Sequence, residues 1–296
     1  MIKVFNRRFG IPKALQFVEG QSSLPKAILT HENGSSCETY LYGAHVTSYR
    51  TSEHEEILYM SSRADFSPGK AIRGGIPLIF PQFGPGALPS HGFARNRNWE
   101  IASTEKSPGG ELKIVFQLQA DEATKSIWPE AFLAEYEVGL SSQLKSSLRI
   151  TNQGAKDFSF QCALHSYFTI GDIGSLTVKG LGNLDFLDNT KKKERSRETR
   201  SDISISSEID RIYLDTPDEL RLEDKKLGRS LRVRKQQFRD AVLWNPWIEK
   251  GASLKDLDPD AYQGFVCLET GAIEPSISLA PGETFEGRQE LSAAKL

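Results

Sequence analysis

A histidine and a glutamate occupy apolar stretches of the sequence in which acid–base chemistry could take place. His165 lies in the segment FSFQCALHSYF (158–168), where most large apolar residues fall on the opposite parity, and Glu269 interrupts the apolar segment FVCLETG (265–271). In a strand, each side chain would point away from the face that the apolar residues bury. An imidazole, with a pKa of about 6.5, can give or take a proton near neutrality. Partial burial would raise the pKa of the glutamate towards the range that a general base needs.

Both residues also have a structural interpretation, which the sequence leaves open. A strand histidine can be satisfied by hydrogen bonds alone, and Glu269 can occupy an exposed alternate position on a sheet. The two residues are 104 positions apart (269 − 165), and no local pattern shows that they meet.

A third group of candidate residues is cationic and lies in a segment rich in glycine and proline. The segment IRGGIPLIFPQFGPGALPSHGFARNR (72–97) carries Arg73, His91, Arg95 and Arg97. Its glycines and prolines favour an ordered loop over a helix or a central strand. Single surface arginines are usually just solvated. A cluster of them in such a loop favours an anion site, because a guanidinium group can bind a phosphate through two hydrogen bonds. The glycine-rich nucleotide-binding motifs do not occur in it.

The elements that would have to position these groups are predicted to be strands. Apolar and polar residues alternate over 111–119, 132–140 and 144–150, and a period of two is typical of strands that bury one face. Asn33-Gly34 predicts a hairpin turn of type I′, because both residues tolerate a positive φ. We therefore expect an all-β fold, a large antiparallel β-sandwich that forms a single domain over residues 1–296.

The composition excludes several classes of protein. Among the 296 residues, 37 Lys+Arg face 39 Asp+Glu, and the formal net charge of −2 excludes a basic nucleic-acid-binding surface spread over the whole chain, though not a local cluster. No apolar run approaches the roughly 20 residues of a membrane-spanning helix, and the N-terminus lacks a secretory signal, so we expect a cytoplasmic protein without a nucleic-acid or membrane partner. Three widely spaced cysteines and five scattered histidines favour neither a disulfide framework nor a metal site. The polar segment 187–208 is predicted to be a solvated connection, because its charges are mixed.

Short motifs along nearly the whole chain give the sequence a resemblance to a known family. They are GAHVTS (43–48), RGGIP (73–77), HGFAR (91–95), ALHSYF (163–168), DRIY (210–213), WNPW (244–247), CLETG (267–271) and LAPGE (279–283). Each motif is weak alone, but together and in this order they are highly specific. The sequence resembles the D-hexose-6-phosphate mutarotases, or glucose-6-phosphate 1-epimerases, of the aldose 1-epimerase family. This resemblance implies a galactose mutarotase-like β-supersandwich.

The resemblance also implies a reaction and roles for particular residues. By analogy with the family, His165 looks like the general acid and Glu269 like the general base that interconvert the α and β anomers of a hexose 6-phosphate, without a cofactor or a metal. Asp210 would bind a sugar hydroxyl. Arg73 and Arg95 would surround the substrate, including its phosphate.

The segment around Ser90 and His91 departs from the family pattern. Many relatives have Gln immediately before the HGFAR-like motif, where this chain has Ser90, and the loop 83–89 is short. A serine would lose a substrate hydrogen bond or make it through water. Ser90 and His91 stay in the predicted substrate-binding set, but the choice among hexose phosphates is left open.

Two other functions are compatible with the same sequence. One is the same reaction on an unphosphorylated aldose, for which the arginines would not be needed. The other is a non-catalytic carbohydrate-binding sandwich, in which Trp244, Trp247 and Tyr213 could stack on sugars, since a fold does not fix a function. The histidine and the glutamate favour an enzyme, because stacking needs neither. We expect a small-molecule hexose phosphate as the partner, and the ordinary composition favours a monomer.

Overall fold

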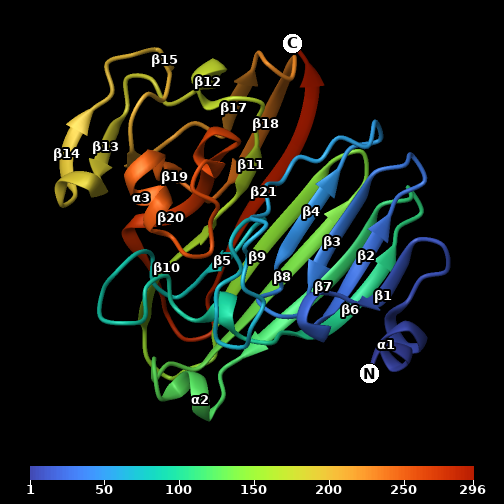
Figure 1. The fold of residues 1–296 in the computed structure, drawn as a ribbon. Helices are drawn as coiled ribbons and strands as arrows, with labels where there is room; N and C mark the ends of the chain where they lie inside the picture. The colour runs from blue at the N-terminus through green and yellow to red at the C-terminus, as the bar shows by residue number, and fades with distance from the viewer.

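The computed structural model describes residues 1–296 and is built mainly of antiparallel strands in three sheets (Figure 1). A four-stranded sheet contains, in order, β1 (Leu15–Glu19), β2 (Pro25–Thr30), β3 (Ser36–Tyr40) and β4 (Val46–Arg50). The three α-helices are short: α1 (Ile2–Phe9), α2 (Glu122–Lys125) and α3 (Trp247–Ser253). None of them is both long and apolar enough to cross a membrane.

Two larger sheets carry the rest of the strands. The nine-stranded sheet has the order β15-β12-β17-β18-β21-β9-β8-β7-β6. Its strands are β6 (Glu100–Lys106), β7 (Leu112–Gln119), β8 (Phe132–Leu140), β9 (Leu144–Asn152), β12 (Leu176–Lys179), β15 (Asp202–Ile203), β17 (Glu219–Asp224), β18 (Arg229–Gln236) and β21 (Thr284–Lys295). The eight-stranded sheet has the order β14-β13-β16-β19-β20-β10-β5, with β11 also paired to β20. Its strands are β5 (Leu78–Ile79), β10 (Phe158–Leu164), β11 (Tyr167–Thr169), β13 (Asp185–Asp188), β14 (Glu194–Arg197), β16 (Ile209–Tyr213), β19 (Asp240–Asn245) and β20 (Phe265–Leu279).

The predicted all-β sandwich and the strands read from alternation are confirmed. In β7, β8 and β9 the buried positions alternate with half-buried or exposed ones over most of each strand. The hairpin prediction at Asn33-Gly34 is wrong in its turn type, because only Gly34 has a positive φ, of 94°. A type I′ turn needs a positive φ at both central residues. The backbone closes a wider loop instead, with His31 N–H donating to Ser35 O at 2.9 Å.

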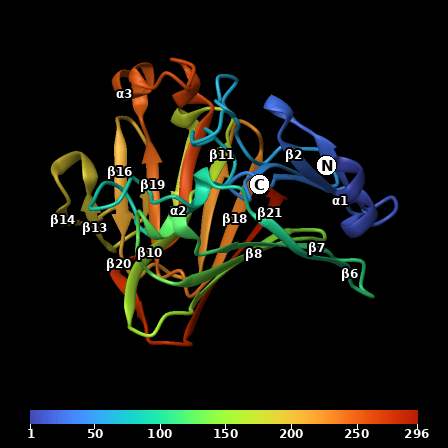
Figure 2. The same ribbon diagram turned by 90° about the horizontal axis from the view of Figure 1, so that it is seen from below.

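The main core joins all three sheets. Phe17 of the four-stranded sheet, Phe116 of the nine-stranded sheet and Leu268 of the eight-stranded sheet belong to one cluster of 56 buried residues. Figure 2 shows the four-stranded and eight-stranded sheets lying beside each other along the nine-stranded sheet, so that one large sheet is covered by two smaller ones. Phe80 and Phe132 lie at the aromatic centre of this core, with ring centroids 5.1 Å apart.

Replacing a core aromatic residue is predicted to lower the free energy of unfolding far more than replacing its neighbour on the strand. Phe132 is fully buried, so Phe132→Ala should lower the free energy of unfolding by about 3–5 kcal/mol. Leu133→Ala, on the opposite and half-buried face of β8, is the matched control and should lose clearly less. Urea unfolding of both variants measures the difference, and equal losses would contradict the assignment of the two faces.

Candidate functional site

Strand pairing places His165 and Glu269 opposite each other. β10 ends one residue before His165 and β11 begins two residues after it, and both strands pair with β20 in the same register. That register puts His165 across from Glu269 on one face of the eight-stranded sheet. The Nε2 atom of His165 lies 3.3 Å from Oε1 of Glu269. Leu164 and Leu268, their neighbours in the chain, point into the main core. The prediction that His165 and Glu269 both point away from the face that the apolar residues bury is therefore confirmed.

Burial shifts the proton affinities of this pair in opposite directions. His165 and Glu269 are only 7% and 1% exposed. Burial lowers the pKa of His165 well below 6.5, and the nearby His91 and arginines lower it further. Burial raises the pKa of Glu269 well above 4.5, and the charge of Asp210 adds to this shift. His165 Nδ1 and Glu269 Oε2 make no hydrogen bond within the protein. Both shifts favour the uncharged form of the group, and the 3.3 Å contact places two groups that can each hold or release a proton side by side.

A buried polar bridge ties the two strands together on the inner side of the sheet. Thr270 Oγ1 donates to Gln289 Oε1 at 2.9 Å, and Gln289 Nε2 donates to Ser166 Oγ at 3.1 Å. Ser166 and Thr270 directly follow His165 and Glu269 in the chain, and Gln289 belongs to β21 of the facing sheet. All three bridging residues are at most 2% exposed. Since a satisfied buried network favours one packing arrangement, the bridge fixes the spacing of the pair.

Arg73 is linked to the pair through Tyr167. Its Nη1 donates to the Tyr167 hydroxyl at 3.0 Å, and its Nε donates to Asp256 Oδ2 at 3.2 Å. The Tyr167 ring stacks on the imidazole of His165, with a centroid distance of 4.8 Å and an interplanar angle of 8°. Arg73 therefore supports the histidine from the side, and Asp256 neutralises its charge. No pattern in the sequence indicates a role for Asp256.

Arg95 lies beside the same pair but has no acidic partner. Its only hydrogen bond within the protein runs from Nη2 to the backbone O of Ser90, at 3.0 Å, and its buried Nε is unpaired. The Ser90 side chain is exposed. His91 packs edge-on against both Phe83 and His165, at centroid distances of 5.0 and 5.7 Å. Burial, reinforced by the charge of Arg95, lowers the pKa of His91 to about 3, so the imidazole is neutral beside an uncompensated guanidinium group.

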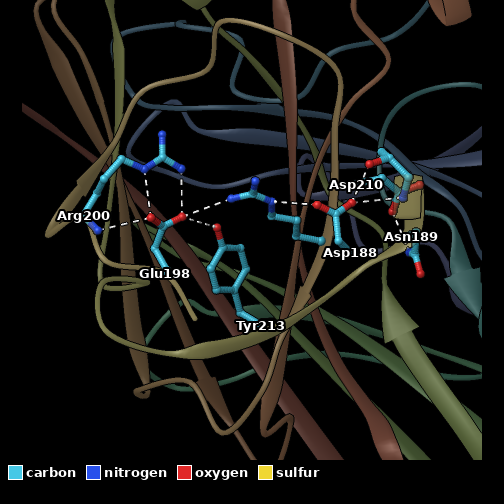
Figure 3. Close-up of polar contacts among 8 residues, drawn as sticks. Asp188, Asn189, Glu198, Arg200, Asp210 and Tyr213 are labelled. Atoms are coloured by element: carbon cyan, nitrogen blue, oxygen red, sulfur yellow. Dashed lines mark hydrogen bonds and ion pairs between the residues drawn. The ribbon is translucent and has the colours of Figure 1, made fainter. Parts of the chain in front are cut away.

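Asp210, the last of the predicted site residues, lies two strands away from Glu269 in the eight-stranded sheet. It lies on β16, where it pairs with Trp244 of β19. Asn189 Nδ2 donates to Asp210 Oδ1 at 2.7 Å (Figure 3). Lys250 Nζ lies 3.8 Å from Asp210 Oδ2. Burial raises the pKa of Asp210. Neither partner was predicted from the sequence, because Asn189 falls in the segment that was expected to be a solvated connection.

Two other places where a sugar could bind are less suitable. The Tyr213 ring is fully buried, so it cannot stack on a sugar as the carbohydrate-binding interpretation required. A surface hollow of about 790 Å³ on the nine-stranded sheet has no hydrophobic lining residue. Four of its five cations pair with acidic residues, as in Lys113 with Glu137 at 3.1 Å, and it offers no aromatic ring on which a sugar could stack.

Comparisons with known proteins identify the family of this chain. The model of a family described as aldose 1-epimerase matches residues 25–292. A protein of Cenchrus ciliaris, provisionally named glucose-6-phosphate 1-epimerase, is 39% identical over 287 residues, which cover 94% of this chain and 87% of the relative. A protein of Escherichia coli K12 with the same provisional name is 36% identical over 235 residues, covering 78% of this chain and 77% of that protein.

Solved structures show the same fold. The crystal structure of a provisionally named mutarotase from Salmonella typhimurium superposes with a TM-score of 0.89 at 29% identity, over 97% of this chain and 96% of that one. A galactose 1-epimerase from Lactobacillus acidophilus shares the fold alone, with a TM-score of 0.72 at 14% identity, over 95% of this chain and 98% of that one. The class is thus that of the galactose mutarotase-like β-sandwich proteins. Within it, the chain belongs to the aldose 1-epimerase family, which is a family of isomerases.

The buried carboxyl group is predicted to make the protein less stable as the pH rises. The pKa of Glu269 is raised above 4.5 in the folded chain, so above that pH the folded state holds a proton that the unfolded state has released. Stability then falls with rising pH by up to about 1.4 kcal/mol per pH unit, until the folded-state pKa is reached. Glu269→Gln removes this dependence. Urea unfolding at pH 5 and pH 8 should show the variant gaining stability over the wild type with pH, and a constant difference would contradict the shift.

Proposed function

We propose that the protein interconverts the α and β anomers of a hexose 6-phosphate, with His165 as general acid and Glu269 as general base. The observation that carries the proposal is the 3.3 Å contact between His165 Nε2 and Glu269 Oε1 on one face of the sheet. Membership of the aldose 1-epimerase family supports the reaction class, and the names of the relatives support a phosphorylated hexose. No cofactor is needed, because the reaction involves only proton transfers and one C–O bond.

The chemistry requires two groups that exchange their roles. The reaction uses the form of the pair in which one proton has moved from Glu269 to His165 across their 3.3 Å contact. Glu269 then removes the proton from the C1 hydroxyl while His165 protonates the ring oxygen, and the bond between C1 and the ring oxygen breaks. The open-chain aldehyde rotates about its C1–C2 bond, and the ring closes on the other face with both transfers reversed. Since the two reacting oxygens are bonded to the same carbon, the acid and the base must lie within a few ångströms of each other, as His165 and Glu269 do.

The proposed anchor for the phosphate is Arg95 rather than Arg73. A phosphate monoester carries about −1.5 to −2 charges at pH 7, and a guanidinium group can bind it through two hydrogen bonds. Arg73 already bonds Asp256 and Tyr167. Arg95 bonds only the Ser90 backbone O, so it has both charge and donors to offer. Ser90 then acts through its carbonyl group, which orients Arg95, and His91 remains a neutral wall of the site.

Loss of either proton-transfer group is predicted to remove most of the acceleration. His165→Ala and Glu269→Gln should each slow the equilibration of freshly dissolved α-glucose 6-phosphate by about 10²–10⁴-fold. Polarimetry or NMR spectroscopy follows the reaction, and His54→Ala, at an exposed turn, is the control. Wild-type rates in both site variants would show that the roles are assigned wrongly.

Substitutions of the two arginines are predicted to affect the kinetics in different ways. Arg95→Ala should raise the KM for glucose 6-phosphate by roughly 10- to 100-fold, the range of a hydrogen bond to a charged group, and should change glucose turnover much less. Arg73→Ala should slow both substrates, because Tyr167 and the stacked His165 lose their support. Steady-state kinetics on the two sugars separates the cases. Equal losses with Arg95→Ala would favour an unphosphorylated aldose as the substrate.

A further inference from the structure

The polar segment 187–208 contains an ordered edge of the eight-stranded sheet. β13 and β14 form a hairpin there, with the 3₁₀ turn η4 (Asn189–Lys191) between them. The expectation of a purely solvated connection is therefore wrong for this part, since charge patterning could not show which charges are paired. The hairpin places Asn189 directly against Asp210, with Nδ2 2.7 Å from Oδ1.

The turn that carries Asn189 is fixed by the residue before it. Asp188 is 5% exposed. Its Oδ1 accepts hydrogen bonds from the backbone N–H and the hydroxyl of Thr190, at 3.0 and 2.6 Å. Its other oxygen, Oδ2, lies 3.5 Å from Arg211 Nε. Arg211 follows Asp210 on β16, so the turn and the strand that it meets are held together on both sides of Asn189.

A second buried carboxylate locks the far end of the hairpin. Glu198, which is 4% exposed, accepts two hydrogen bonds from the guanidinium group of Arg200, both at 2.8 Å, and one from its backbone N–H at 3.2 Å. Arg211 Nη1 and the Tyr213 hydroxyl donate to the same carboxylate at 3.1 and 3.2 Å. Figure 3 shows these contacts running from Arg200 through Glu198 towards Asp188 and Asn189. The hairpin is thus anchored to β16 at two points, which is more order than a loop connection requires.

We propose that Asn189 and Asp210 together recognise one ring hydroxyl of the sugar, so that Asn189 is a specificity-determining residue. A sugar hydroxyl both donates and accepts a hydrogen bond, whereas an ionised carboxylate only accepts. Asp210 Oδ2 can accept a hydrogen bond from the hydroxyl group. Asn189 has a second amide hydrogen, which bonds nothing in the protein and can donate to the hydroxyl oxygen. The first amide hydrogen holds Asp210 in place, and the half-buried position of both residues leaves them within reach of a ligand.

This inference rests on the proposed function and extends it to substrate choice. A site that hydrogen-bonds a hydroxyl through two groups discriminates against an analogue that lacks it, because buried polar groups are then left unpaired. The Asn189 side chain and the recognised ring hydroxyl of the sugar are therefore the two partners of one interaction. Removing both together should cost little more than removing either one.

The test compares Asn189→Ala with the wild type on glucose 6-phosphate and its 2-deoxy, 3-deoxy and 4-deoxy analogues. We expect Asn189→Ala to lower kcat/KM on glucose 6-phosphate by roughly 10- to 100-fold. On one deoxy analogue, and only one, the variant should be no slower than the wild type. Lys191→Ala, an exposed neighbour in the same turn, is the matched control and should behave as the wild type on all four sugars.

The outcomes separate a failure of this inference from a failure of the proposed function. The role of Asn189 alone is overturned if the wild type is active and Asn189→Ala loses no kcat/KM. It is also overturned if, on every deoxy analogue, the loss from Asn189→Ala multiplies the loss from the missing hydroxyl. A wild type that does not accelerate equilibration overturns both proposals. Asn189→Ser, which keeps a donor on a shorter side chain, should recover part of the loss. A thermal unfolding temperature equal to that of Lys191→Ala would show that the effect on rate is not a folding defect.

Discussion

The rest of the site depends on keeping an acid and an imidazole buried together. Removing ionisable groups from water is costly unless they are paired or change their protonation state. In this chain the desolvation cost is reduced by pairing, because His165 and Glu269 lie opposite each other in the sheet, with a contact of 3.3 Å between Nε2 and Oε1. Their backbones are fixed by the sheet, and Gln289 bonds the residue after each of them from the facing sheet. The pair therefore has little freedom to separate or to hydrate.

The surrounding charges are arranged unequally around this pair. Arg73 is neutralised by Asp256 and supports Tyr167, whereas Arg95 has no acidic partner. Arg95 opposes the upward shift in the pKa of Glu269, and Asp210 reinforces it. An anion bound at Arg95 would cancel the effect of that arginine. In the proposed reaction, the proton affinity of Glu269 would thus depend on whether an anion is bound at Arg95, which would couple phosphate binding to the proposed chemistry at C1.

The sequence could predict the strands and the faces of the candidate residues, because alternation is a local property of the chain. It could not predict that His165 meets Glu269, since the register between strands 104 residues apart (269 − 165) is set by the whole sheet. The contact of Arg73 with Asp256 spans 183 residues and left no local trace. The resemblance supplied candidate roles for residues at the site, but not the supporting contacts of Asn189, Asp256 and Gln289. The mixed charges of 187–208 predict a solvated segment, because the sequence does not show which charged residues form ion pairs in the fold. In the structure Glu198 is buried and bonds Arg200.

The order of strands separates the proposed chemistry from the proposed recognition. β20, which carries Glu269, and β10, which ends one residue before His165, lie inside the eight-stranded sheet, whereas β13 and β14 form its edge. A central strand is held by hydrogen bonds on both sides, so a one-residue shift there would turn Glu269 into the core. An edge hairpin lacks that restraint, and a sequence change there can move a side chain without disturbing the rest of the sheet. The ion pairs around Glu198 and Asp188 supply the missing restraint locally. A sequence change at Asn189 could therefore alter the proposed recognition while the geometry of the proposed proton-transfer pair stays fixed.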